Sequence, residues 1–441
     1  MDFFKNAIRR SIKEVNRWFA PGLGIKRWVL VILLGTTLMA LGFAVYLIDV
    51  YRGAAESWIL DVVSILSLRF LPRLARALVY GSIGIGLVLF GLLGLNKAII
   101  KPFVKPGKNI LDTISLYRKR DRGPKIVAIG GGTGLSTLLR GLKHHTHNLI
   151  AIVTVTDDGG SSGELRRNLG ILPPGDIRNC LVALSDDEEM LTQVFQYRFG
   201  EKAGVNGHSL GNLFISALTD ISGSFEEAVA ESGRVLAIRG KVLPSSLNDV
   251  RLVAEIQLPS KDTIVKVVGE SKIQKIEGNI KRLWIEPSNP LPFPLSVQAI
   301  LNADLIIVGP GSLYTSILPN LLVPDLAEAL RASKALKLYI CNVANEHGET
   351  DGYSSADHIH VIEKHLENMH FDVVVCNNSF DNRLPKNVEW VLPNAELEEQ
   401  HSVYFEHLVD KQFPWRHDSK KLADVIINLY YEKTGPLNKE L

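Results

Sequence analysis

The order of apolar and polar residues changes character several times along the 441-residue chain. From residue 125 onward, short apolar runs alternate with stretches of helical periodicity. Five runs are expected to form buried strands: 125–129, 149–154, 305–308, 338–342 and 373–376. Continuous apolar runs separated by helices are typical of a parallel sheet covered on both faces. The pattern predicts an α/β fold with a Rossmann-like, doubly wound and mostly parallel sheet.

One stretch departs from this alternation. Residues 235–286 contain short strand-like segments without helical periodicity between them, which predicts a small antiparallel β insertion. The Rossmann-like domain is then expected to comprise residues 125–234 and 287–441. Residues 101–124, which are rich in proline, glycine and charge, are expected to be a linker.

The first hundred residues contain two long uncharged stretches, at 28–48 and 77–96. Each is close to the roughly 20 apolar residues that a helix needs to cross a bilayer. Lysine and arginine crowd the outer flanks, so the positive-inside rule places both ends of the pair in the cytosol. We therefore expect residues 1–100 to form a hairpin of two transmembrane helices. The protein would be a multi-pass protein of the inner membrane with its main domain in the cytoplasm.

Composition narrows the class of function. The formal net charge is only +2, which is not the basic excess of a nucleic-acid-binding protein, and no nucleic acid partner is expected. The three cysteines, Cys180, Cys341 and Cys376, lie in apolar runs without metal-ligand spacing. Buried free thiols are therefore expected, rather than disulfides or a zinc site.

Two loops after predicted strands are rich in glycine, at 130–134 and 309–316. In an open parallel sheet, ligands bind at the carboxyl ends of the strands. Glycines there let a phosphate approach the backbone N–H groups of a helix start. A structural tight turn is the alternative for the first loop taken alone, and its spacing matches neither a dinucleotide fingerprint nor a P-loop, so no NAD is expected. The candidate phosphate contacts in these loops are Gly131, Gly132, Thr133, Gly134, Gly311, Ser312 and Tyr314.

Two adjacent carboxylates, Asp157 and Asp158, follow the second predicted strand. They repel each other unless a cation or a ligand offsets their charge. They are candidates to hold Mg²⁺ on a phosphate, to accept a ribose hydroxyl, or to act as a base. Ser161 and Ser162, in the same loop, are expected to contact the ligand.

Residues 172–179 form a further loop that leads into a helix. Asp176 is expected to be the N-cap. Capping does not explain Arg178, because a cation is disfavoured at a helix N-terminus; we expect Arg178 to meet an anion or one of the paired aspartates. The remaining candidate ligand contacts are Asp176, Asn179, Asn212 and Asn342.

The segment 207–211 fits the nucleophile-elbow pattern of hydrolases. That pattern requires a strand before the serine, and the preceding residues are polar and rich in glycine. We therefore reject a hydrolase and expect Ser209 or Asn212 to line the ligand cleft.

Six motifs occur in a fixed order along the chain: GGGTGLSTLLRGLK, TVTDDGGSSGELR, PPGDIRNCLVAL, GHSLGNL, GPGSLYTSILPNLL and YICNVANEHGETDGYS. Together they resemble the gluconeogenesis factor family (YvcK-like), which is related to the phospholactate transferases (CofD-like). The resemblance covers about residues 123–400. The expected membrane hairpin departs from the shorter members of the family.

The resemblance implies a protein that binds a UDP-sugar such as UDP-GlcNAc and supports cell shape and envelope synthesis during gluconeogenic growth. It also implies envelope-synthesis proteins as partners and a homo-oligomer. Tyr314 then lies in the loop that meets the nucleotide sugar.

The related transferases move a phospholactyl group from a GDP-type donor to a deazaflavin with magnesium. On that hypothesis Asp158 contacts the acceptor, Asp157 and Asp158 hold the metal, and Arg178 contacts the transferred phosphate. These three would be the catalytic residues. Gly159 and Gly160 stand in place of the Trp-containing acid loop of the transferases. Whether the protein is a binding protein or an enzyme stays open at this point.

Overall fold

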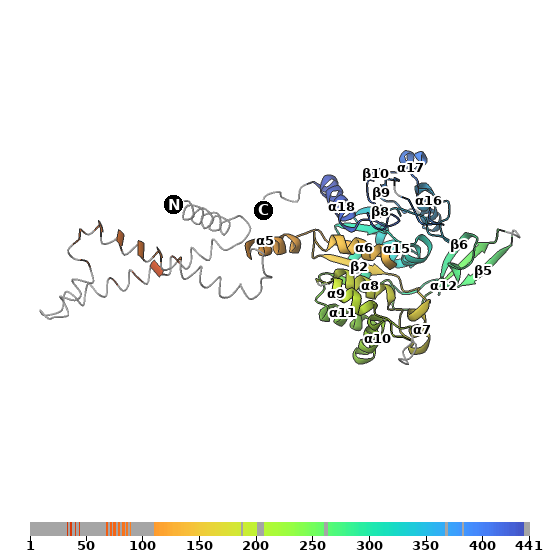
Figure 1. The fold of residues 1–441 in the computed structure, drawn as a ribbon, viewed down its shortest axis with the longest axis horizontal. Coiled ribbons are helices and arrows are strands. Elements are labelled where there is room, and N and C mark those ends of the chain that lie inside the picture. The colour runs from red at the N-terminus through yellow and green to blue at the C-terminus, as the bar shows by residue number, and fades with distance from the viewer. Residues whose placement is uncertain are drawn as a thin grey trace. The chain divides into compact units, whose positions relative to one another are not determined.

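The structure, a computed structural model, describes residues 110–435 apart from 187, 201–206, 260–262, 367–368 and 382, together with isolated positions between 33 and 89. The chain divides into two compact units, residues 1–118 with 438–441 and residues 119–437. The sheet and the candidate site belong to the second unit (Figure 1).

The structure contradicts the predicted location in the inner membrane, and we correct that prediction. Within the described part of the chain, no helix is both long and apolar enough to cross a bilayer. A span needs about 20 apolar residues, and the longest described helix, α18 (Ser419–Thr434), has 16 and includes several charges. Most positions of the two expected spans, 28–48 and 77–96, lie outside the described residues.

Seven strands form one parallel sheet in the order β10-β9-β8-β7-β1-β2-β3. They are β1 (Ile126–Gly130), β2 (Leu149–Val153), β3 (Lys241–Pro244), β7 (Leu305–Val308), β8 (Leu336–Ile340), β9 (Val373–Asn377) and β10 (Val403–Glu406). This sheet confirms the predicted α/β class. The order runs outward in opposite directions from β1 and β7, so these neighbours form the topological switch point, where ligand crevices open.

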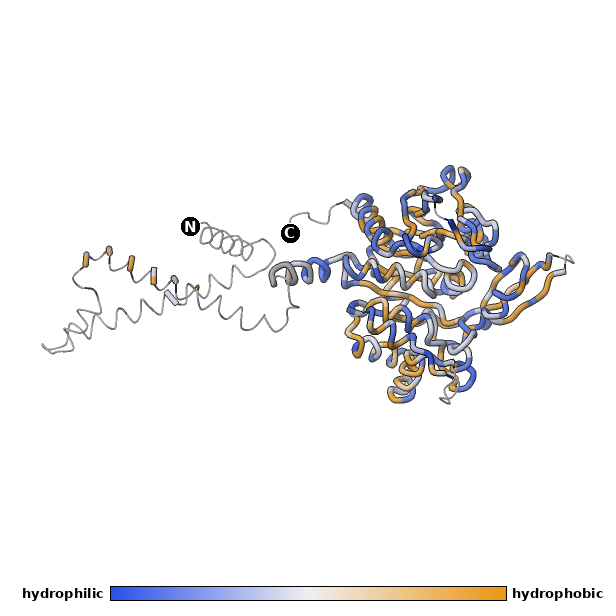
Figure 2. The backbone as a smooth tube through the Cα atoms, in the orientation of Figure 1, coloured by the Kyte–Doolittle hydropathy of each residue, from blue (hydrophilic) through white to orange (hydrophobic). Residues whose placement is uncertain are grey.

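Helices and a π-helix connect the strands. They are α6 (Gly132–Leu142), α7 (Gly160–Leu169), α8 (Gly175–Leu184), α9 (Glu188–Gln196), α10 (Leu210–Ser222), α11 (Phe225–Val235), α13 (Pro294–Leu301), η3 (Leu313–Ile317), α14 (Leu318–Leu321), α15 (Pro324–Ala332), α16 (Ser355–His365), α17 (Ala395–Gln400) and α18. Of these, α6, α8, α11, α13 and η3 contact the main sheet directly. The central strands β1, β7 and β9 are buried along their whole length, and Figure 2 shows apolar residues concentrated in the interior of this unit. The switch point therefore sits on a buried apolar core.

The predicted antiparallel insertion is a three-stranded sheet in the order β5-β4-β6. Its strands are β4 (Arg251–Gln257), β5 (Ile264–Val268) and β6 (Asn279–Glu286), with the one-turn helix α12 (Glu270–Ile273) between β5 and β6. The predicted insertion, 235–286, began too early, because β3 pairs in parallel with β2 as the edge of the main sheet. A four-residue edge strand has too little pattern to be assigned to either sheet.

Two smaller predictions can also be compared with the structure. Part of the expected linker, 101–124, forms helix α5 (Ile110–Asp121), since that stretch contains no proline or glycine. Cys180, Cys341 and Cys376 are buried and free, as predicted.

Candidate functional site

The loops after β1, β7 and β8 meet at the switch point. A Cβ atom added to Gly134 would lie 2.5 Å from the carbonyl oxygen of Pro310, so the start of α6 can touch the β7 loop only because residue 134 is glycine. Asn342, after β8, fastens the same loop: its Nδ2 donates to the carbonyl of Gly311 (2.8 Å) and its Oδ1 accepts from the N–H of Gly311 (3.1 Å). Ser312 donates to Glu346. The glycine-rich loops 130–134 and 309–316 thus lie side by side, with Thr133 exposed.

Asp176, in the first turn of α8, links that helix to the glycine-rich loop after β1. Its carboxylate accepts the N–H of Gly132, and a Cβ atom on Gly131 would lie 2.7 Å from its Oδ2. The predicted N-cap role of Asp176 is wrong, because α8 begins at Gly175 and its N-cap is Pro174. Asp176 instead receives a free N–H from the N-terminus of the neighbouring helix α6.

The paired aspartates point toward different elements. Asp157 accepts the N–H of Gly159 (2.9 Å) and the hydroxyl of Ser162. Asp158 Oδ1 accepts the N–H of Ser271 in α12 (2.8 Å), which ties the insertion to the core. Asp157 and Asp158 thus make their hydrogen bonds to different elements. Among the described residues, no group of three or more His, Cys, Asp or Glu side chains could hold a metal ion.

Four carboxylates gather between the strand tips and the insertion: Asp157, Asp176, Glu270 and Glu349, called here the acid cluster. Glu270 of α12 accepts from Thr156 (2.9 Å). Glu349 accepts from Thr315 (2.7 Å) and from the side chain of Gln274 in the insertion (3.1 Å). The cluster therefore draws residues from the core and from the insertion.

The acid cluster is electrostatically strained. Burial raises the pKa of Asp157, and burial together with the charge of Asp157 raises the pKa of Asp176 to about 6. Burial, then Asp157 and Asp176, raises the pKa of Glu270 well above its usual range. Burial and the neighbouring Glu346 raise the pKa of Glu349 to about 7. Carboxyl groups this close need shared protons or a cation to stay together.

Tyr314, a candidate ligand contact from the sequence, is enclosed by the protein. Its side chain is 1% exposed inside η3, and its hydroxyl lies 2.9 Å from that of Tyr353. Tyr353 is partly exposed and lines a pocket, so it is an aromatic side chain that a ligand could reach. Tyr353 is not among the residues predicted from the sequence, although it lies in the last of the six motifs.

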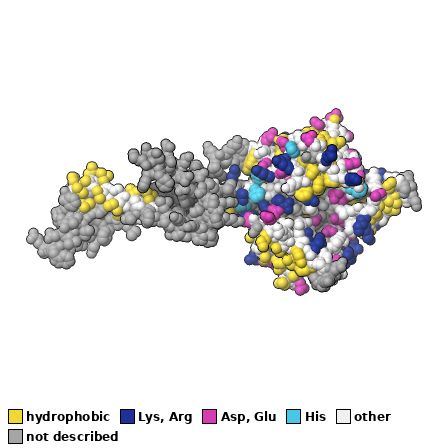
Figure 3. All heavy atoms as spheres, in the orientation of Figure 1, with side chains coloured by type: hydrophobic (Ala, Val, Ile, Leu, Met, Phe, Trp, Pro, Cys, Tyr) yellow, Lys and Arg dark blue, Asp and Glu magenta, His cyan; other side chains and the backbone are white. Residues whose placement is uncertain are grey.

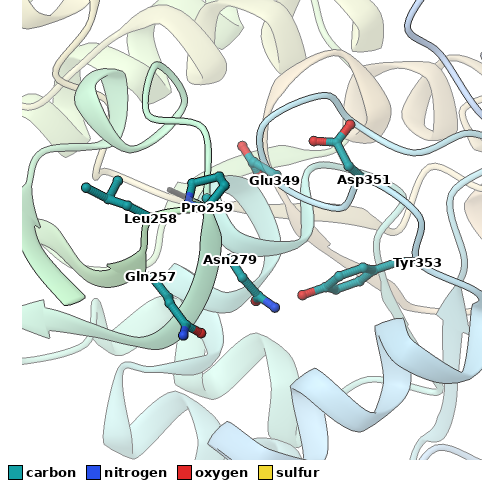
Figure 4. A pocket seen from close by; sticks show the side chains of 8 residues that line it. Gln257, Leu258, Pro259, Asn279, Glu349, Asp351 and Tyr353 are labelled. Carbon is teal, nitrogen blue, oxygen red and sulfur yellow. The ribbon is translucent and has the colours of Figure 1, made fainter. Parts of the chain in front are cut away.

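A pocket of about 450 Å³ opens beside Tyr353 (Figure 4). Its lining comes from the ends of β4 and β6 and from the loop after β8. The residues are Gln257, Leu258, Pro259, Gly278, Asn279, Glu349, Asp351 and Tyr353. Figure 4 shows the Tyr353 hydroxyl and the Asn279 amide pointing into the same space. Glu349 belongs both to this wall and to the acid cluster, so the pocket borders the strand tips.

A second polar group lies between α7, α8 and α10. Arg178 donates to Ser209 (2.5 Å), to Asn212 (2.8 Å) and to Asn179 (2.9 Å). Asn212 in turn donates to Ser161 (2.9 Å). Arg178 therefore contacts neutral oxygens rather than the paired aspartates. Ser209 is fully buried and caps α10, which agrees with the rejection of a hydrolase elbow.

The sequence profile of the family described as "2-phospho-L-lactate transferase CofD" matches residues 126–432. The chain belongs to this CofD family. The gluconeogenesis factor of Bacillus subtilis (strain 168) is 45% identical over 318 residues, which are 70% of this chain and 99% of the relative. The gluconeogenesis factor of Listeria innocua is 43% identical over 322 residues, with 72% and 98% coverage.

These matches confirm the resemblance to the gluconeogenesis factors of the CofD family. A further relative, from Nostoc sp. (strain PCC 7120), is provisionally named a gluconeogenesis factor. It is 43% identical over 449 residues, which are 96% of this chain and 94% of the relative. The crystal structure of a UPF0052 family member from Bacillus halodurans has 42% identity and a TM-score of 0.64. It covers 69% of this chain and 99% of that one.

Proposed function

We propose that the protein binds a nucleotide diphosphate of the nucleotide-sugar type, such as a UDP-sugar, at the switch point. The diphosphate would lie on the loops at Gly131, Gly132 and Gly311, where helix starts offer N–H groups. The main support for this proposal is the pocket of about 450 Å³ next to these loops. Glu349 lines the pocket and also accepts a hydrogen bond from Thr315 in the loop after β7. Binding of a sugar nucleotide would connect the protein to envelope synthesis and cell shape during gluconeogenic growth.

The pocket has the chemistry to recognise a nucleobase or a sugar. Tyr353 offers an aromatic face, and base stacking on such a face contributes about 1–3 kcal/mol. Gln257 and Asn279 carry amides, each with a donor and an acceptor, which complement the paired donor and acceptor of a base edge. The Tyr314 hydroxyl lies 2.9 Å from the Tyr353 hydroxyl, so this contact positions the Tyr353 side chain before a ligand arrives.

Magnesium fits this site as a partner of the phosphates. Mg²⁺ is commonly held by one or two carboxylates together with substrate phosphates and waters. Asp157 and Asp176 lie on the phosphate side of the acid cluster, beside Ser162 and Gly132. A bound ion would supply positive charge between the carboxylates and the diphosphate. We propose Asp157 and Asp176 as the candidate pair, in place of Asp157 and Asp158.

Calorimetry with UDP-GlcNAc, UDP-glucose and GDP, each with and without Mg²⁺, tests this function. Tyr353→Ala is expected to weaken binding of the best ligand by about tenfold or more, because a stacking face is lost. Tyr431→Ala, on α18 and outside the pocket lining, is the matched control. The proposal fails if the wild-type protein binds none of these ligands, or if both variants lose the same affinity.

A magnesium-dependent phospholactyl-type transferase is the second candidate. Two acids of the cluster have pKa values near the working range of a general acid or base, Asp176 at about 6 and Glu349 at about 7. Incubation with a GDP-type phospholactyl donor and a deazaflavin acceptor is the direct test. Product that disappears in Asp176→Asn but persists in Tyr353→Ala would favour the transferase, whereas binding without turnover would favour the nucleotide-sugar protein.

A further inference from the structure

The group at the N-termini of α7, α8 and α10 contains a buried cation, Arg178, that forms no ion pair with any described residue. Arg178 is 8% exposed. Its hydrogen bonds go to the neutral side chains of Ser209, Asn212 and Asn179. Within the described residues, no carboxylate lies within ion-pair distance of it. Leaving a charge in the interior in this way is costly unless something else compensates it.

The guanidinium also has an unused edge. Three of its five N–H donors make the hydrogen bonds above, and the buried Nε has no partner among the described residues. Burial lowers the pKa of Arg178, and the nearby Arg198 lowers it further. Arg198 thus adds a second positive charge nearby, whereas Asp176 and Asp157 act in the opposite direction on the pKa of Arg178. An arginine edge of this kind matches the paired oxygens of a phosphate or carboxylate.

Neighbouring side chains hold Arg178 in place. Asn212 accepts from Arg178 and donates to Ser161, and Ser161 Oγ lies 2.9 Å from His208 Nδ1. The N ε2 atom of His208 lies 3.6 Å from Glu164. Gly211 leaves room for the arginine stem, since a Cβ atom there would lie 2.6 Å from Arg178 Cδ.

We propose that Arg178 forms a second anion subsite, which takes a phosphoryl or carboxylate group. The cation-bearing diphosphate would lie on the acid cluster, and the second anion would lie against Arg178. The identity of the whole ligand, a nucleotide diphosphate with a second anionic group, depends on the proposed function. The subsite itself depends only on the position and contacts of Arg178. On the face shown in Figure 3, lysine and arginine side chains are interspersed with acidic ones. This face therefore has no broad positive patch that would attract an anion, and recognition would depend on a local site such as Arg178.

Inorganic phosphate is the probe for this subsite, titrated into the full chain. We expect the 15N-detected Nε–H signal of Arg178 to shift with added phosphate. Arg178→Gln is expected to weaken phosphate binding by about tenfold or more, because a charge-assisted hydrogen bond contributes about 1.5–3 kcal/mol. Arg167→Gln removes the same charge from an exposed position of α7 and is the matched control.

The outcomes separate the two proposals. If the Arg178 signal does not respond to phosphate, or if Arg167→Gln loses as much affinity as Arg178→Gln, the subsite is wrong. Phosphate binding at Arg178 without any binding of UDP-sugars or GDP would sink only the proposed function. Should Arg178→Gln fail to fold, the wild-type Nε–H titration decides alone.

Discussion

Asp176 accepts the N–H of Gly132 with a carboxylate that burial and the charge of Asp157 favour in its protonated form. One side chain therefore carries two opposed roles. It closes the start of α6 as a hydrogen-bond acceptor, and it adds negative charge to a cleft that already holds three other acids. Such an arrangement is unfavourable for the empty protein and useful for a protein that binds a cation with its ligand.

The raised pKa of Asp176 predicts the direction of a pH effect on stability. Its stabilising contribution is complete below the ordinary value of 3.8 and is lost as pH rises through about 6. Asp176→Asn should therefore raise the free energy of unfolding at pH 8 by about 1–2 kcal/mol, since one pKa unit corresponds to about 1.4 kcal/mol. Urea unfolding at pH 4 and pH 8 measures this.

The same substitution should weaken magnesium-dependent nucleotide binding. A variant that is both more stable and a poorer binder would identify Asp176 as a ligand-site residue. If Asp176→Asn destabilises the protein equally at both pH values, the hydrogen bond to Gly132 outweighs the charge effect, and the argument from the raised pKa is wrong.

At the scale of elements, Asp158 connects the loop after β2 to the N-terminus of α12. This contact explains why an acid next to Asp157 is tolerated: the two carboxylates serve different elements. The insertion also reaches the core through Gln274, which donates to Glu349. The walls of the candidate site therefore depend on how firmly the insertion is held.

Asp158→Ala removes the acceptor of the Ser271 N–H. Loss of a helix-start acceptor costs about 0.5–2 kcal/mol, and we expect faster hydrogen exchange in α12 and β5 with no change in β1. Asp325→Ala, an exposed aspartate on α15, is the control. Hydrogen exchange read by mass spectrometry makes the comparison. Uniform exchange across both regions would show that Asp158 does not fasten the insertion.

The sequence predicted the elements that are buried on both faces and missed those at the edges. β1 and β7 are continuous apolar runs because both of their faces are covered by helices. β3 is four residues long at one edge and was assigned to the insertion, and β10, at the other edge, is only partly buried and was not predicted. The order of strand, glycine loop and helix was enough to place the loops 130–134 and 309–316 together.

The directions of side chains could not be predicted in the same way. Tyr314 and Tyr353 both follow strands of the sheet, and only packing decides that Tyr314 is enclosed in η3 while Tyr353 faces the pocket. Adjacent residues such as Asp157 and Asp158 share a loop but turn to different neighbours. Glu270 was not proposed, because its role arises from a long-range approach of the insertion to Thr156.

At the scale of the whole molecule, the acid cluster couples ligand binding to protons in solution. Glu349, with a pKa of about 7, is partly protonated at neutral pH. A ligand that arrives with Mg²⁺ favours the ionised carboxylates, so protons would be released as it binds. Affinity should then rise between pH 6 and pH 8. The heat of binding should also differ between Tris and PIPES, which take up protons with different enthalpies; identical heats in the two buffers would mean that no proton leaves the cleft.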